Sequence, residues 1–85
     1  MTQKDVQLKS GSGLQAKIAA EFIQKASSYK SSVWLEKEDK KANAKSLLGL
    51  LALEITSNDT LSIIADGVDE NTAVDELVEF LILNV

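Results

Sequence analysis

The chain has 85 residues, of which 45% are hydrophobic and 26% charged, and this balance excludes a disordered tail or an all-polar linker. The length leaves room for one compact core, so we expect a single domain over residues 1–85. Nine basic and thirteen acidic side chains give a net charge of −4, which repels nucleic-acid phosphates and anionic membrane surfaces.

The first part of the chain predicts a strand followed by a helix. Val6 and Leu8 alternate with polar residues, which predicts a half-buried strand over residues 4–8. The Ser-Gly-Ser-Gly run at residues 10–13 ends this strand. An amphipathic helix over about residues 14–28 is expected next, because apolar residues then recur at spacings of three and four. These residues are Leu14, Ile18, Ala19, Phe22, Ile23 and Ala26.

A β-hairpin is predicted for the middle of the chain. Val33 and Leu35 lie two positions apart, so a strand there turns both toward the core and Trp34 toward the opposite face. The polar residues 37–40 form a turn, and a short third strand follows near residues 41–43. A large apolar ring on an uncovered face is compatible with contact with a second copy of the chain. Strand exchange at a hinge of residues 10–13 is another route to a homodimer. The alternative is a monomer in which Trp34 lies over neighbouring side chains.

Ser46 stands directly before an apolar run and is a favoured N-cap for a short helix, because its hydroxyl can accept a bond from a first-turn amide. At about 100° per residue, the leucines of this helix fall on two sides, and a small one-sided domain cannot bury both. One side carries Leu47, Leu48 and Leu51, and the other carries Leu50 and Leu53. An exposed leucine cluster commonly marks a site for a protein partner.

The last part of the chain predicts a turn at residues 57–59, then a strand and a helix. Leu61, Ile63 and Ala65 alternate in the strand, and Asp69 is a plausible N-cap for the helix. Its inward side should carry Ala73, Leu77, Val78 and Leu81, with Asp75, Glu76 and Glu79 in water. The order βαββαβα in so short a chain favours the α+β class, with an antiparallel sheet covered by helices on one face.

Several kinds of chemistry find no support in the sequence, which contains neither cysteine nor histidine. Disulfides, thiolate and imidazole catalysis, metal ligation by these residues and phosphohistidine chemistry are therefore excluded. No nucleophile has a recognisable base nearby, so we expect no enzyme. No apolar run spans a membrane, and the charged start lacks a signal-peptide core, which favours a cytoplasmic location.

Two charged clusters are interpreted as solvated surface. The acidic residues Asp66, Asp69, Glu70 and Asp75 lack the regular alternation and glycine placement of a calcium loop, so no metal or other cofactor is expected. The lysines Lys37, Lys40, Lys41 and Lys45 form a local basic patch in an acidic chain. We interpret the patch as a solvated hairpin that could attract an acidic partner.

Three segments, in the correct order, resemble the histidine-containing phosphocarrier (HPr) family. Residues 13–22 (GLQAKIAAEF) look like its active-site segment, usually GLHARPAA. Residues 41–50 (KANAKSLLGL) look like the regulatory-serine segment of Gram-positive HPr proteins, and residues 64–70 (IADGVDE) like the turn before their last helix. The resemblance covers essentially the whole chain. It implies an open-faced βαββαβα sandwich with a four-stranded antiparallel sheet and three helices on one face.

The chain departs from the family at the residue that would accept phosphate. Gln15 stands where the phosphorylatable histidine is expected, and a glutamine amide accepts no phosphoryl group. This replacement is the mark of the catabolite-repression HPr (Crh) group, which the sequence resembles. Two further departures are Lys17 for the family's arginine and Ile18 for its proline. A lysine point charge in place of the planar arginine fork is expected to weaken a phosphate or carboxylate contact.

The resemblance also implies a function. Ser46 would be phosphorylated by HPr kinase/phosphorylase, and the chain would then act as corepressor of a LacI-type catabolite control regulator. The implied partner-binding residues are Lys17, Ala20, Lys45, Ser46, Leu47, Leu48 and Leu51.

Three other functions share some features with the sequence. Direct modulation of a metabolic enzyme by the unphosphorylated chain is not separated from the corepressor role by the sequence. A sugar phosphotransfer intermediate needs a histidine that the chain lacks. An acyl carrier protein would be all-helical with aspartate before its serine, whereas Lys45 stands there.

Overall fold

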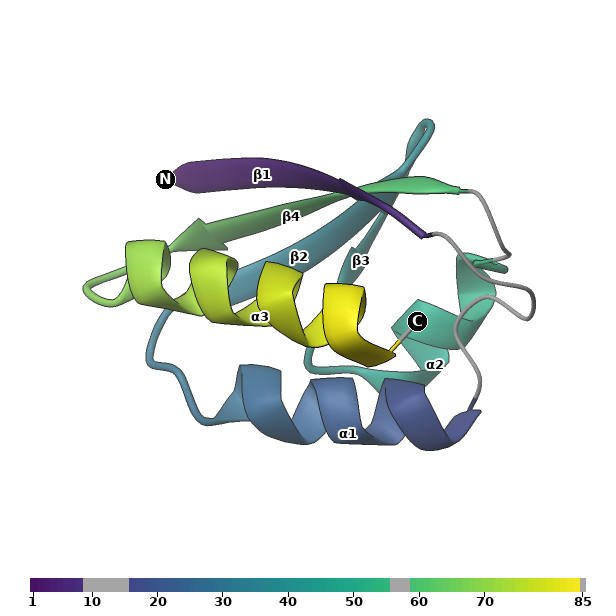
Figure 1. Cartoon of the computed structure of the whole chain (residues 1–85), viewed down its shortest axis with the longest axis horizontal. Coiled ribbons are helices and arrows are strands. Elements are labelled where there is room, and N and C mark those ends of the chain that lie inside the picture. The colour runs from purple at the N-terminus through teal and green to yellow at the C-terminus, as the bar shows by residue number, and fades with distance from the viewer. Residues whose placement is uncertain (9–15, 56–58, 85) are drawn as a thin grey trace.

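The computed structural model describes residues 1–8, 16–55 and 59–84, which form four strands and three helices. In chain order these are β1 (Thr2–Gln7), α1 (Ala16–Ser27), β2 (Ser32–Lys37), β3 (Lys40–Asn43), α2 (Leu47–Ala52), β4 (Thr60–Asp66) and α3 (Glu70–Asn84). The strands form one antiparallel sheet in the order β1-β4-β2-β3, and the helices lie on one side of it (Figure 1). The predicted α+β fold and element order are confirmed.

The alternation in the strands places the core between the sheet and the helices. Val6 of β1 pairs with Leu61 of β4, and Leu35 of β2 pairs with Ile63, and all four side chains are buried. The predicted inward faces are therefore confirmed for these strands. β1 spans Thr2–Gln7 rather than residues 4–8, because Thr2 and Gln3 already pair with Ala65 and Ile64 of β4, a long-range contact that alternation in β1 alone does not show.

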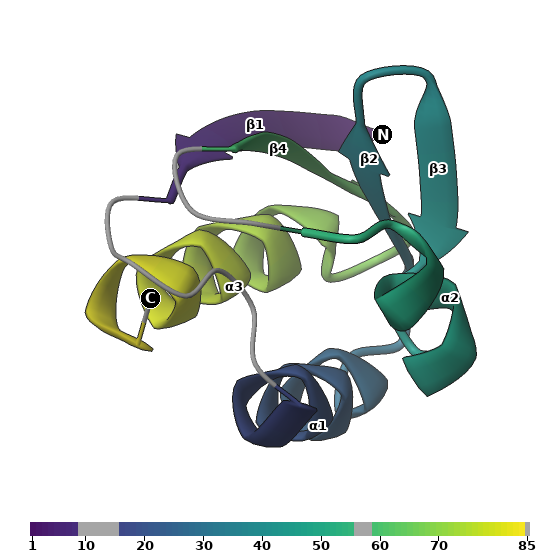
Figure 2. The same ribbon diagram turned by 90° about the vertical axis from the view of Figure 1, so that its right-hand side faces the viewer.

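The helices complete this core from below the sheet. The buried residues of α1 are Ala19, Phe22 and Ala26, and those of α3 are Ala73, Val74, Leu77 and Leu81. The Phe22 ring lies 6.1 Å from the Phe80 ring between their centroids, which joins the two helices. Figure 2 shows α2 beside α1, under the β2–β3 end of the sheet.

The opposite face of the sheet carries Trp34, as predicted. Trp34 is half-buried, and the Lys41 ammonium lies 4.8 Å from its ring centroid, a cation–π contact across β2 and β3. Its register partner Ile64 is only 5% exposed although no helix covers it. The Trp34 side chain beside Ile64 accounts for that burial, which the alternation of β4 alone did not predict.

Asp69 ties the loop before β2 to the start of α3. Its backbone carbonyl accepts the Ala73 N–H at 2.9 Å, so the helix starts where the sequence predicts. Its carboxylate accepts bonds from the Lys30 N–H at 2.8 Å and from the Ser31 N–H and hydroxyl at 2.9 and 2.5 Å. The carboxylate thus joins two loops 38 residues apart.

Gly67 allows these two loops to approach. Its φ of +156° lies outside the range that side chains favour, and a Cβ there would lie 2.6 Å from Ser31 Cα. Any other residue would push Ser31 away from the Asp69 carboxylate. The close approach therefore depends on a glycine at this turn.

The bonds to Asp69 predict that the fold is less stable in acid. The Ser31 hydroxyl first, and then the Lys30 N–H, lower the Asp69 pKa from 3.8 to about 2. This contribution to the free energy of unfolding is therefore present above pH ~4 and is lost as the pH falls toward 2. Urea unfolding of Asp69→Asn should show a weaker loss of stability over this range than the unsubstituted chain.

Asp39→Asn is the matched control for this measurement. Asp39 is exposed in the β2–β3 turn, and within the described part of the chain its carboxylate has no hydrogen-bond or ion-pair partner. Its replacement should leave the pH dependence of unfolding unchanged. Equal pH profiles for Asp69→Asn and the unsubstituted chain would contradict the assignment.

Candidate functional site

Ser46 caps α2, as the sequence predicts. Its φ and ψ of −118° and 119° are extended, its carbonyl accepts the Leu50 N–H at 3.0 Å, and its hydroxyl oxygen accepts the Gly49 N–H at 3.2 Å. Ser46 itself is half-buried. The hydroxyl therefore lies at the positive end of a short helix and remains open to solvent on one side.

The two sides of α2 differ as predicted. Leu47, Leu48 and Leu51 are 44%, 80% and 48% exposed, and we call these three residues the leucine face. Leu50 and Leu53 are 2% and 3% exposed in the core. Three exposed leucines beside a modifiable hydroxyl form an apolar surface that a protein partner could cover.

Two predicted site residues, Lys17 and Ala20, lie on α1. Both are exposed, and α1 packs against α2. Within the described part of the chain, neither side chain bonds to Lys45 or Ser46. Gln15 lies outside the described residues. The structure thus brings α1 and α2 together without testing the predicted role of position 15.

Lys45 has a bond within the chain. Its ammonium donates at 3.1 Å to the carbonyl of Tyr29, two residues after α1, and its backbone N–H donates to Asn43 Oδ1 at 2.9 Å. Tyr29 is held in turn by a hydrogen bond from its hydroxyl to Glu76. Burial, then that bond, raises the Tyr29 pKa above its usual range. Lys45 therefore anchors the segment that carries Ser46, and its contact with a partner stays a prediction.

The basic patch is only partly a solvated hairpin. Lys40 is exposed, as expected, and Lys41 covers Trp34. The Lys37 side chain, however, is only 16% exposed and pairs with Asp59 at 3.0 Å. The sequence did not predict this ion pair, because Lys37 stands in a polar segment and Asp59 is 22 residues away.

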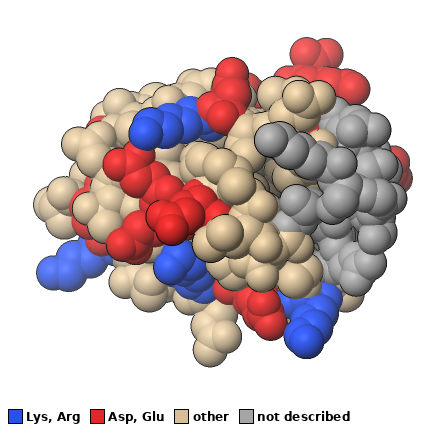
Figure 3. All heavy atoms as spheres, viewed as in Figure 1, with Lys and Arg blue, Asp and Glu red and all other residues tan. Residues whose placement is uncertain are grey.

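Acidic side chains gather on the face that α3 presents (Figure 3). This helix contains Glu70, Asp75, Glu76 and Glu79 and no basic residue. Lys4 of β1 pairs with Asp75 at 2.5 Å. The predicted acidic cluster is only partly solvated surface, because Asp69 bonds to the loop of Lys30 and Ser31 and Glu70 pairs with the Met1 amino group at 2.8 Å. Within the described ranges no group of acidic residues is arranged to hold a metal ion. The face is unsuited to nucleic-acid phosphates.

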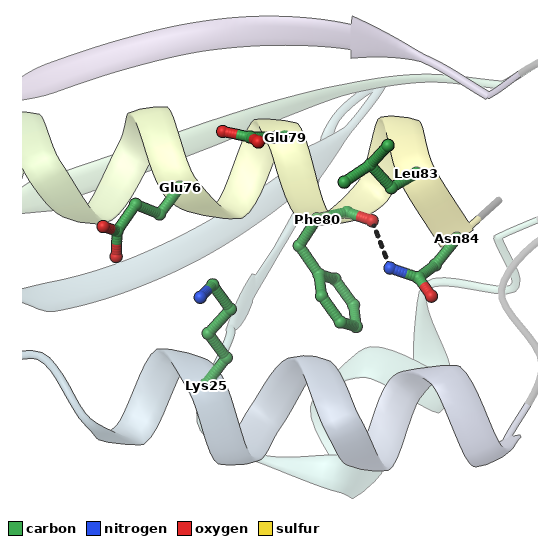
Figure 4. A pocket seen from close by; sticks show the side chains of 6 residues that line it. All are labelled: Lys25, Glu76, Glu79, Phe80, Leu83 and Asn84. Atoms are coloured by element: carbon green, nitrogen blue, oxygen red, sulfur yellow. Dashed lines mark hydrogen bonds between the residues drawn. The ribbon is translucent and has the colours of Figure 1, made fainter.

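A shallow groove of about 300 Å³ lies between α1 and α3 (Figure 4). It is lined by Lys25, Glu76, Glu79, Phe80, Leu83 and Asn84. None of the predicted site residues lines it. Among the described helices, none is long and apolar enough to span a membrane.

Comparisons with known proteins agree with the fold and the motifs. The family model described as "PTS HPr component phosphorylation site" matches residues 2–82. The HPr-like protein Crh of Halalkalibacterium halodurans is 43% identical over 81 residues, covering 95% of this chain and 96% of the relative. Crh of Bacillus subtilis is 41% identical, covering 95% of each chain.

Solved structures give the same result. HPr-C-His from Thermoanaerobacter tengcongensis superposes with a TM-score of 0.90 at 37% identity, covering 95% of this chain and 91% of that one. Bacillus subtilis Crh, described as a dimer with a swapped domain, superposes with a TM-score of 0.79 at 40% identity, covering 100% and 98%. The fold, the ordered motifs and these similarities together show that the chain belongs to the HPr family, as an HPr-like protein of the Crh group.

Proposed function

We propose that this chain is a regulatory protein of carbon catabolite repression. HPr kinase/phosphorylase would phosphorylate Ser46, and the modified chain would act in the cytoplasm as corepressor of a LacI-type catabolite control regulator. The observation that carries this proposal is the position of Ser46. This half-buried residue caps α2, the helix that carries the leucine face.

A phosphate on Ser46 fits this position. It would add a charge of about −1.5 to −2 and acceptor oxygens near the Gly49 N–H and the positive end of α2. The helix should therefore tolerate the modification without unfolding. What changes is the surface, which gains an anion able to bond with an arginine or lysine of the partner.

The leucine face would supply the second half of the contact. Complete burial of one leucine side chain contributes about 1.5–3 kcal/mol, and Leu48 is 80% exposed before any partner binds. A phosphate anchor and apolar burial of this size together could shift binding from negligible to micromolar. Lys17 and Ala20, exposed on the adjacent α1, would lie at the rim, and Lys45 would hold Ser46 in place.

A second candidate is direct modulation of a metabolic enzyme by the unphosphorylated chain. The leucine face is exposed in the unmodified protein, so part of the docking surface exists without phosphate. Both roles use the chain as a binding partner, and we propose no catalytic role for it.

The first prediction from this proposed function separates the contribution of the phosphate to binding from that of the leucine face. After treatment with HPr kinase and ATP, the unsubstituted chain should bind the catabolite regulator, as measured by calorimetry. Ser46→Ala and Leu48→Glu should each bind at least ~10-fold more weakly, a loss of about 1.4 kcal/mol or more. Leu48 is 80% exposed, and Ser46→Ala removes only the capping bond to the Gly49 N–H, so the fold should survive either change.

Leu83→Glu is the matched control, since Leu83 is 74% exposed on α3 and lies outside the leucine face. It should bind like the unsubstituted chain. Tight binding by unphosphorylated Ser46→Ala, or by phosphorylated Leu48→Glu, would show that the mechanism is wrong.

The second prediction is that the chain takes no part in sugar phosphotransfer. Gln15 has no nucleophilic nitrogen, and the sequence has no histidine to replace it. Incubation with phosphoenolpyruvate and enzyme I should therefore give no phosphorylated species by mass spectrometry. An acid-labile adduct would refute this. Gln15→His should recover acceptance only poorly, because Lys17 and Ile18 also depart from the family pattern.

The third prediction is a homodimer. Structures of Bacillus subtilis Crh are described as dimers, one with a swapped domain. In this chain Lys41 and the half-burial of Trp34 leave less of the indole for a second copy, which favours strand exchange at residues 10–13, the hinge that the sequence predicts and that lies outside the described residues. Sedimentation over a wide concentration range should detect the dimer, and a monomer at every concentration would refute it.

A further inference from the structure

The turn that ends α2 is held in an unfavourable backbone conformation. The N–H groups of Leu53 and Glu54 donate to the carbonyls of Leu50 and Leu51, both at 3.2 Å. Glu54 then adopts a φ of +52°, in the left-handed region that favours glycine. This conformation costs a glutamate more free energy than it costs a glycine, so a contact that holds the turn lowers that cost.

Lys37 supplies such a contact from the sheet. Its ammonium donates to the Glu54 carbonyl at 2.7 Å and pairs with the Asp59 carboxylate at 3.0 Å. Both side chains of the pair are shielded, with 16% of Lys37 and 22% of Asp59 exposed. Lys37 is the last residue of β2 and pairs with Lys40 of β3, so its backbone is held in the hairpin from which the ammonium extends.

Other contacts also hold α2 in place. Leu50 within the helix, Leu53 at its C-cap and Ile55 just after it are buried in the core, and before the helix the Lys45 ammonium donates to the Tyr29 carbonyl, just after α1. A helix of six residues has little stability of its own. The orientation of the leucine face therefore depends on what fixes the two ends.

From this arrangement we infer that Lys37 is a positioning residue for partner binding. Through the Glu54 carbonyl it fixes the last turn of α2 and so the direction in which Leu51 faces the partner. Lys37 touches no partner itself. The inference rests on the proposed docking role of the leucine face, and it assigns Lys37 a role that the resemblance to HPr did not include.

Amide hydrogen exchange tests the positioning without any partner. Lys37→Met should raise exchange at the Leu53 and Glu54 amides at least ~10-fold, because the turn loses the bond that holds it, while β4 amides such as Ile63 should change less than twofold. Lys37→Arg keeps a cation and a donor and should retain most of the protection. Lys40→Met, an exposed lysine on the same hairpin, is the matched control and should change nothing.

A second-site change tests the proposed cause. Glycine adopts a positive φ without strain, so Glu54→Gly introduced into Lys37→Met should recover much of the lost protection at Leu53. If Lys37 acts only through its charge, Glu54→Gly should not restore the protection of the Leu53 amide, because glycine replaces no charge.

Calorimetry with the catabolite regulator links the turn to function. Phosphorylated Lys37→Met should bind at least ~10-fold more weakly than the unsubstituted phosphoprotein, and the variant that adds Glu54→Gly should recover part of that affinity. Uniformly raised exchange across β4, or unchanged affinity in Lys37→Met, would overturn the inference. If the unsubstituted phosphoprotein fails to bind the regulator, the proposed function fails, and the exchange at Leu53 and Glu54 still decides whether Lys37 positions α2.

Discussion

A chain of 85 residues covers only one face of its four-stranded sheet, and the placement of its exposed apolar side chains follows from this constraint. The long helix α3 packs beneath β1 and β4, and α1 packs against α3 and α2. The short helix α2 must then lie at the β3 end, where it can bury Leu50 but not Leu48. The leucine face, which we assign to partner binding, is thus exposed because α2 can turn only one of its two apolar sides toward the core.

Much of this arrangement could be predicted from local patterns. Alternation in β2 and β4 gave the inward faces, and the serine before an apolar run gave the start of α2. Such signals lie within a few residues of one another, so a single sequence contains them. The split of the leucines between core and surface followed from helix geometry, because α2 is apolar on both sides.

Contacts between distant segments could not be predicted in this way. The pair of Lys37 with Asp59 and the bonds of Asp69 with Lys30 and Ser31 each depend on the final approach of two loops. Their residues look like ordinary polar turn residues in the sequence. The burial of Ile64 on the uncovered face had the same origin, since it depends on Trp34 from another strand.

The strand order has a consequence for the behaviour of the protein at high concentration. β1 and β3 form the two edges of the sheet, and both expose charged side chains, among them Asp5 on one edge and Lys40 on the other. Charged edge strands discourage the addition of further strands at either edge, which is the step by which open-ended aggregates grow. Exchange of β1 between two chains satisfies the same pairing with β4 and stops at two subunits, so it adds no strand to either edge.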